Sequence, residues 1–296
     1  MFGNYIYAIM YLIFTSIQKI FLKQNEVNLY IVNLISILVV FGVIVVKRYN
    51  ENKLNTLISK KWFSKDALIL SSIGTFQTLT MTYCLRKLPI SLTVPVGASW
   101  VIFALLFENL MLDYEITTEI ILIMCLFMFG ICVVNYHHLK VIDRGVNLMV
   151  LLILIISILL KGYYTTYIKK ITNKYDTDDK ILLDFSYISI GISLGLCLFN
   201  VNDIRKSNFS FKSIFIVGTV LLICNNIKQY GRFKSLELIS ENEWNLISSM
   251  ILIPILILSR IIFKEKIKIN QIIGIIILCV SFYLLYNMNE KSGKLI

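Results

Sequence analysis

The stretch GNYIYAIMYLIFTSIQKIF, residues 3 to 21, recurs in pattern as GVNLMVLLILIISILLKGY, residues 145 to 163. Each stretch begins with a glycine and reaches a lysine, Lys19 or Lys161, sixteen residues later, near the end of an apolar run. The two lysines therefore stand at the same depth of two similar segments. This match predicts that the two halves of the chain are related in structure.

A second pair of segments supports the relation between the halves. EITTEIILIMCLFMFGICVVNY, which begins at Glu115, has the apolar pattern of KIKINQIIGIIILCVSFYLLYN, which begins at Lys266. The spacing is wider for this pair, and the extra length fits a longer connection in the second half, around the charged residues 169 to 180. The sequence therefore predicts two repeats, residues 1 to 140 and residues 141 to 296, that together form one membrane domain.

Composition places the chain in a membrane. Hydrophobic residues make up 57% of it, and its mean hydropathy of +0.76 is too high for a soluble domain of this size. Backbone polar groups in hydrocarbon must be satisfied within their own element, so we predict an all-α polytopic membrane protein with ten transmembrane helices. Five helices per half would turn the second half over, giving two inverted five-helix repeats. The predicted spans are residues 3 to 22, 27 to 46, 67 to 85, 90 to 112, 116 to 136, 146 to 167, 181 to 200, 212 to 231, 243 to 263 and 267 to 287.

The net charge of +11 is spread through the loops without a continuous basic face. Anionic lipid headgroups are therefore the expected counter-charges, and nucleic acid is not an expected partner. Slightly more lysine and arginine falls on the side that carries the two termini, which predicts that both termini are cytoplasmic. We expect a multi-pass protein of the cell membrane, and the abundance of Lys, Ile, Asn and Tyr indicates a bacterial origin.

Two stretches carry a resemblance to a known family. PILILSRIIFKEKIKINQIIGIIILCVSFYLL has a proline in the ninth span, a glutamate after it and a glycine in the tenth: Pro254, Glu265 and Gly274. LPISLTVPVGASWVIFALLFENLMLDYEIT, from Leu88, resembles the fourth helix of the same group. On these stretches the chain resembles the drug/metabolite transporter (DMT) superfamily, EamA type. The resemblance implies a secondary transporter that moves a small metabolite, such as an amino acid or a related polar or anionic solute, by alternating access, with export as the expected direction.

The sequence leaves two other function classes to be compared with transport. The resemblance includes flippases of lipid-linked sugars, so a flippase or a flippase subunit stays open. An enzyme is less favoured, because the spans lack paired carboxylates or a histidine base, and Asp176, Asp178 and Asp179 are interpreted as a solvated, charge-balanced turn. His137 and His138 stand together without further ligands for a metal site. We expect no cofactor and no metal; the expected partners are a small-molecule substrate, membrane lipids and, compatible with the resemblance, a second copy in a homodimer.

The paired lysines are the first candidates for a substrate site. A charged group at the middle of a bilayer costs about 3 kcal/mol on insertion scales, so such groups usually face a cavity or a partner. The alternative is that Lys19 and Lys161 extend their stems to the headgroups, since each lies near the end of its span. Both hypotheses stay open on the sequence alone.

The eighth span supplies further polar candidates. Asn225, Asn226 and Gln229 fall nearly on one helical face, because residues three and four apart are neighbours. Gln77 in the third span corresponds to a polar position of the eighth, so the two helices are predicted to face one cavity. The alternative is hydrogen bonding between helices. Two tryptophans are candidates to line the same cavity: Trp100 and Trp244.

Two acids are the candidates for coupling to an ion. Glu108 lies inside the fourth span and Glu243 begins the ninth. Glu108 could carry a proton or neutralise a lysine, or it could simply approach the interface. The tyrosines that follow Lys161, namely Tyr163, Tyr164 and Tyr167, could line the same cavity, but an interfacial aromatic belt is the favoured interpretation.

Overall fold

The computed structural model describes residues 2–24, 27–113, 116–142, 148–206, 210–238, 244, 247–248, 250–264 and 268–291, and every regular element in these residues is a helix. The first half contains α1 (Phe2–Gln24), α2 (Leu29–Asn50), two short 3₁₀ helices η1 (Leu54–Ile58) and η2 (Lys60–Phe63), α3 (Lys65–Lys87), α4 (Ile90–Ala98), α5 (Trp100–Leu112) and α6 (Thr118–Ile142). The second half contains α7 (Leu148–Ile171), α8 (Thr177–Asp184), α9 (Tyr187–Phe199), α10 (Val201–Lys206), α11 (Phe211–Leu238), α13 (Leu252–Phe263) and α14 (Ile269–Lys291).

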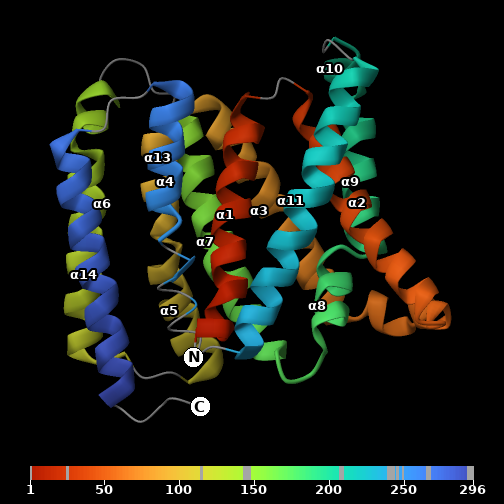
Figure 1. Cartoon of the computed structure of the whole chain (residues 1–296), viewed down its shortest axis with the longest axis horizontal. Coiled ribbons are helices and arrows are strands. Elements are labelled where there is room, and N and C mark those ends of the chain that lie inside the picture. The colour runs from red at the N-terminus through yellow and green to blue at the C-terminus, as the bar shows by residue number, and fades with distance from the viewer. Residues whose placement is uncertain are drawn as a thin grey trace.

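Eight helical segments in the described part of the chain are long and apolar enough to cross a membrane. Two further apolar helices are shorter, Ile253–Phe263 and Ile269–Ser281. The prediction of an all-helical, multi-pass membrane protein is therefore confirmed, whereas the count of ten spans stays a prediction. The N-terminus of α1 and the C-terminus of α14 lie on the same side of the bundle (Figure 1).

The fourth predicted span is divided in the middle. It forms α4 and α5, which meet at Ser99. Pro95 lies inside α4 and lacks the N–H that an uninterrupted helix needs, which favours a break in this region. The division leaves Trp100 as the first residue of α5, well away from the ends of the complete span.

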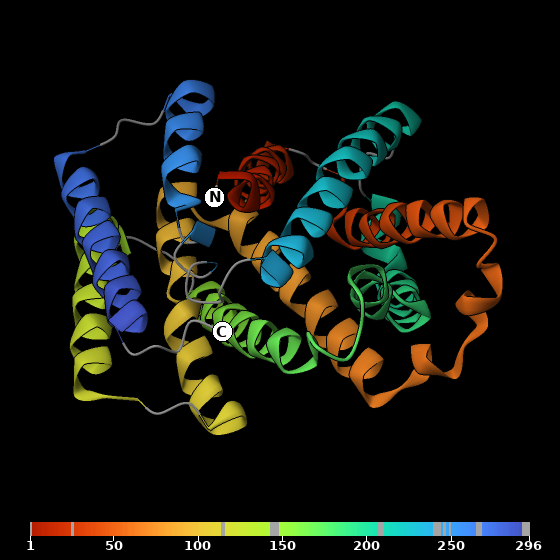
Figure 2. The same ribbon diagram turned by 60° about the horizontal axis from the view of Figure 1, so that its bottom comes forward.

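The helices pack in related pairs. α1 packs along α11, and α3 packs along α7, while α6 and α14 lie side by side at one edge of the bundle and α2 packs against α9 at the other (Figures 1 and 2). The α6 and α14 backbones approach closely at two glycines. A Cβ on Gly274 would lie 2.7 Å from the Val134 nitrogen and 2.9 Å from the Gly130 oxygen, so only glycine fits there.

The first helix turns its apolar side outward. Ile6, Ile9, Ile13 and Ile17 follow one another at helical spacing and are each at least 41% exposed. The opposite face buries Gln18 and other polar side chains inside the bundle. This pattern is the reverse of that in a soluble bundle, and it suits a helix with lipid on one side and a polar interior on the other.

A close approach of α1 and α11 at Gly231 gives a testable prediction. A Cβ at Gly231 would lie 2.7 Å from the Tyr7 carbonyl oxygen, whereas the nearest atom to a Cβ at Gly218, on the same helix, would be 3.8 Å away. We expect Gly231→Ala to lower the free energy of unfolding by about 2 kcal/mol, because the two backbones must separate. Gly218→Ala should leave it unchanged or raise it slightly.

The measurement is the unfolding temperature and the monodisperse yield of both variants in detergent. Both variants add one methyl group to the same helix, so a general effect of alanine would change them equally. Equal stability of the two variants would contradict the close packing of α1 against α11.

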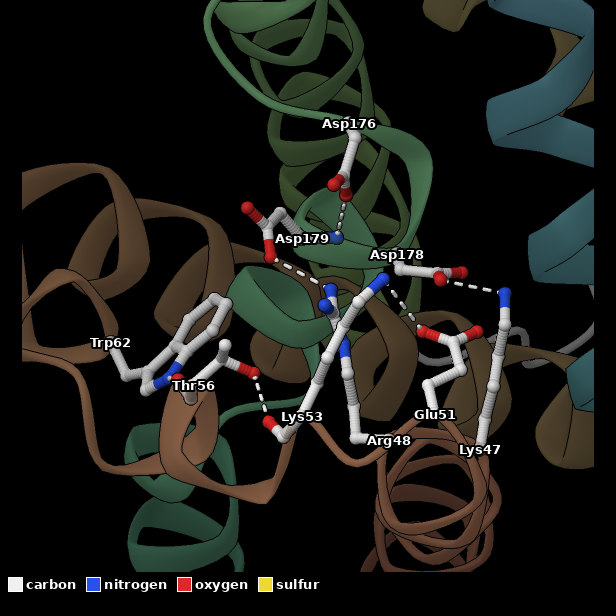
Figure 3. Close-up of polar contacts among 9 residues, drawn as sticks. All are labelled: Lys47, Arg48, Glu51, Lys53, Thr56, Trp62, Asp176, Asp178 and Asp179. Carbon is white, nitrogen blue, oxygen red and sulfur yellow. Dashed lines mark hydrogen bonds and ion pairs between the residues drawn. The ribbon is translucent and has the colours of Figure 1, made fainter.

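An ordered ionic cluster lies at the end of the bundle where α2 finishes and α8 begins (Figure 3). Arg48 donates a hydrogen bond of 3.1 Å to Asp179 in a buried ion pair, and Lys47 donates one of 2.6 Å to Asp178 near the surface. Asp176 caps α8 by accepting from the Asp179 backbone N–H at 2.7 Å. The interpretation of these aspartates as a solvated turn is wrong for Asp179, which is buried against Arg48, whereas Asp176 is exposed and Asp178 lies near the surface.

Another contact between the halves lies nearby. Lys174, in the segment after α7, donates a hydrogen bond to Asp66 at the start of α3, and this bond raises the pKa of the Lys174 ammonium. The Tyr167 hydroxyl donates to the same carboxylate at 2.7 Å. Residues of the first half are thus tied to residues of the second half at this end of the bundle.

Candidate functional site

A cavity of about 130 Å³ lies inside the bundle. Its walls come from α1, α2, α3, α7 and α11, with contributions from the junction of α4 and α5 and from the end of α8. Both halves of the chain therefore contribute to it. The cavity is the reason that polar side chains can occur in the middle of apolar spans.

One face of α11 supplies a row of polar side chains. Asn225, Lys228, Gln229 and Arg232 are spaced three and four residues apart and all line the cavity. Asn226 is rotated by about 100° from Asn225 around the helix. Its amide donates to the Leu222 carbonyl at 2.7 Å, away from the cavity wall.

A hydrogen-bond network fixes the ammonium group of Lys228. It donates to the Gln18 amide oxygen at 2.7 Å and to the Asn225 amide oxygen at 3.3 Å. The Gln18 amide in turn donates to the same Asn225 oxygen at 2.7 Å, and the Asn225 amide donates to the Ser36 hydroxyl. The network joins α1, α2 and α11, so their packing determines where this cation sits.

The two repeated lysines both line the cavity, one from each half. The Lys161 ammonium lies over the Trp100 ring, 4.5 Å from its centre. A cation over an aromatic face is stabilised by the quadrupole of the ring, more so where water is scarce. The break between α4 and α5 brings Trp100 to this position.

The carboxylate of the cavity comes from Asp184, the last residue of α8. The Tyr164 hydroxyl donates a hydrogen bond to it, and the Arg232 guanidinium lies 4.5 Å from the centre of the Tyr164 ring. A Cβ on Gly74 would overlap the Asp184 carboxylate, so the absence of a side chain there makes room for the acid.

The charges of the lining are unequal. Among the described residues that line the cavity, Lys19, Lys161, Lys228 and Arg232 carry positive charge, and Asp184 alone carries a carboxylate. In a site of low dielectric constant such a cluster of cations repels itself unless an anion is present. The excess of basic side chains in the lining therefore favours negative charge in the cavity.

The structure brings together six of the sequence-predicted residues at this cavity and leaves three outside its lining. The lining includes Lys19, Gln77, Trp100, Lys161, Asn225 and Gln229. It does not include Asn226, Trp244 or Glu108 among the described residues. Glu243 lies outside the described residues.

Two of the residues outside the lining, Trp244 and Glu108, are buried elsewhere in the bundle. Trp244 is buried behind the cavity wall, with its ring 4.8 Å from that of Tyr11, which itself lines the cavity. Glu108 is fully buried in α5, and the Lys169 ammonium lies 3.8 Å from its carboxylate. Neither residue can touch a molecule in the cavity without a rearrangement.

Sequence reasoning missed four important residues of the lining. Lys228 directly precedes Gln229 and belongs to the same polar face of α11. Arg232 lies seven residues after Asn225, so an extended count along that helical face would have found it. Tyr164 was assigned to an interfacial belt, but it is buried and bound to Asp184. Asp184 itself carries no local signal, because only the packing of α8 against α3 and α11 brings it to the cavity.

A model of the EamA-like transporter family matches residues 148–287. The second half of the chain is EamA-like. This finding confirms the EamA-type resemblance over the matched residues. The matched family is one of membrane transporters, and the apolar helices of the described residues support a multi-pass membrane protein.

The chain was also compared with individual proteins. A search of curated proteins finds no match. A solved crystal structure covers 98% of this chain, and 98% of its own chain is covered, with a TM-score of 0.69 and 10% sequence identity. At this identity the likeness concerns the fold alone.

Proposed function

We propose that this protein is a secondary transporter of a small, anionic metabolite and that the central cavity is its substrate site. The observation that carries the proposal is the lining of the cavity, where the described residues place four cationic side chains against one carboxylate. Lysine is a compact point charge, and arginine presents a planar fork that matches carboxylate and phosphate groups. A carboxylate-bearing or phosphate-bearing solute, such as an acidic amino acid, would satisfy these donors.

The proposal includes ten transmembrane helices in two inverted repeats, residues 1 to 140 and 141 to 296. The packing of the helices supports it: α1 lies on α11 as α7 lies on α3, so the first helix of each half packs on the third of the other. α6 and α14, the fifth helix of each half, also pair with each other. Rocking of one half against the other would then expose the cavity to each side in turn.

Three features of the proposal follow from the sequence. Export, the cell membrane as location and cytoplasmic termini are the expectations from the family resemblance and the charge bias. A homodimer belongs to the same expectation, and the mass of the purified protein in detergent tests it. Enzymatic activity is not part of the proposal, because the lining residues suit binding and lack a paired nucleophile and base.

A flippase for a lipid-linked sugar is the second candidate. At about 30 Å³ per water molecule, a cavity of about 130 Å³ holds roughly four waters, which suits a small metabolite better than a glycolipid headgroup. A flippase would also need a lateral opening for the lipid chain. Transport of a fluorescent lipid-linked sugar in vesicles, without any response to soluble anions, would favour this candidate.

The experiment that tests the proposal is thermal stabilisation of the purified protein by soluble ions. We expect a mixture of sulfate, phosphate and succinate to raise the unfolding temperature in a saturable way, because a ligand that binds only the folded state stabilises it. Choline chloride at equal ionic strength is the control for salt. The same small shift with choline and with the anion mixture would contradict an anion site.

A further inference from the structure

We propose that Asp184 carries a proton together with the anion, so that the protein is a proton–anion symporter. This inference rests on the proposed function of the cavity as an anion site. It assigns the coupling role to an acid that the sequence did not single out. Of the two acids considered from the sequence, Glu108 lies outside the lining, and Glu243 lies outside the described residues.

The placement of Asp184 is the first support. Its side chain is only 6% exposed, yet it lines the polar cavity. The carboxylate accepts a hydrogen bond from the Tyr164 hydroxyl and lies against the Cα of Gly74. An acid that is enclosed by protein but still reaches the cavity can exchange a proton only through that cavity.

The charged groups around Asp184 are the second support. From α11, Arg232 and Lys228 are close enough to act on it electrostatically. From α7, the Tyr164 hydroxyl faces Asp184, and Lys161 lies one turn earlier along the same lining. From α1, the lining presents Lys19 and the Tyr11 hydroxyl. From α3 the lining presents Gly74, Thr75 and Gln77, which do not ionise in the usual pH range. On its own helix, Asp179 and Lys180 are engaged elsewhere, with Arg48 and Glu237.

The coupling follows from the charge balance. When Asp184 is ionised, it neutralises part of the positive charge that an entering anion would use. A proton from water that binds an Asp184 carboxylate oxygen removes this negative charge, and the cavity gains one unit of positive charge for the anion. By linkage, a bound anion favours the protonated acid to the same degree. When the anion leaves, Asp184 returns its proton to water. The positive charge of Arg232 then balances the ionised carboxylate again.

Symport changes the expected direction of transport. A cell that maintains an inward proton gradient would drive the anion inward when each anion moves with a proton. Export, the direction implied by the resemblance, would then require a steep outward gradient of the anion. Coupling through Asp184 therefore predicts uptake under ordinary conditions.

The test compares anion affinity at different pH in three proteins. Affinity for the mixture of sulfate, phosphate and succinate is measured by thermal stabilisation between about pH 5.5 and about pH 8. Wild type should bind about tenfold more tightly at the acidic end, a coupling within the range usual for linked sites. Asp184→Asn, which mimics the protonated acid, should bind tightly at both ends. Asp178→Asn is the matched control on the same helix and should behave as wild type, because Asp178 pairs with Lys47 outside the cavity.

Comparison of wild type with Asp184→Asn separates the titration of the protein from the titration of the probe anions. Phosphate and succinate change their own charge in this range, but they do so equally for wild type and Asp184→Asn. The ratio of the two affinities therefore reports Asp184 alone. A second measurement is the uptake of protons from weakly buffered solution when pH-matched anions are added. Wild type should take up roughly half a proton per bound anion at the pH of strongest coupling, the most that a tenfold effect on one acid allows, and Asp184→Asn none.

The outcomes distinguish this inference from the function on which it rests. No stabilisation of wild type by the anion mixture at any pH would overturn the anion site itself. Saturable stabilisation with the same pH profile in wild type and Asp184→Asn would overturn the coupling and leave the anion site standing. If Asp184→Asn does not fold, Tyr164→Phe takes its place: loss of the hydrogen bond to the ionised carboxylate should move the pH profile to higher pH, and an unmoved profile would contradict the proposal.

Discussion

Lys161→Met is expected to lower the uptake of labelled phosphate and succinate into proteoliposomes by about 30-fold or more. The ammonium group lines the cavity over the Trp100 ring, and methionine keeps the volume of the stem while it removes the charge. Loss of one partner of a buried charged contact commonly costs about 2 kcal/mol or more, which corresponds to this factor. Lys19→Met should act in the same direction, and the double variant should be worse.

Lys161→Arg keeps the positive charge and tests whether the cavity requires the shape of an ammonium group. A planar guanidinium is a poor copy of a point-like ammonium in a fitted cavity, so we expect uptake between those of wild type and Lys161→Met. Lysines that only reach for headgroups would tolerate both changes. Normal uptake by Lys161→Met and Lys161→Arg, at equal amounts of inserted protein, would refute a functional lysine at this position.

Arg48→Met is expected to lower the free energy of unfolding by about 3 to 5 kcal/mol. The Arg48 and Asp179 side chains are 7% and 12% exposed, and removal of the cation leaves a buried carboxylate without its counter-charge. Lys47→Met is the matched control, because Lys47 is the next residue and pairs with Asp178 on the same helix. Its side chain is 45% exposed, so its loss should cost less than about 1 kcal/mol.

Denaturation of both variants in detergent, followed by the helical signal, measures the difference. This ion pair joins α2 of the first half to α8 of the second. A large loss for Arg48→Met would therefore also mean that the contact between the halves stabilises this arrangement of the bundle. Equal, small losses for the two variants would show that burial of the pair contributes little.

The lining of the cavity was partly predictable, because helical spacing is a property of the sequence. The positions of Lys19 and Lys161 followed from the repeat, and the polar face of α11 followed from residues three and four apart. The same reasoning included Asn226, which faces away, because a helix turns by about 100° per residue and a neighbour in sequence is not a neighbour on the face. It also included Trp244, whose ring packs behind Tyr11.

The sequence by itself determined the membrane location, the helical class, the approximate spans and the family resemblance, since these depend on composition and local periodicity. Only the tertiary structure decided that α4 and α5 separate at Ser99, that Tyr164 donates to Asp184, and that Arg232 lies over the Tyr164 ring. These residues lie on different helices, and no local pattern encodes how far one helix is rotated or shifted against another. The close contacts that fix these positions, such as Gly74 against Asp184 and Gly231 against Tyr7, exist only once the helices have packed.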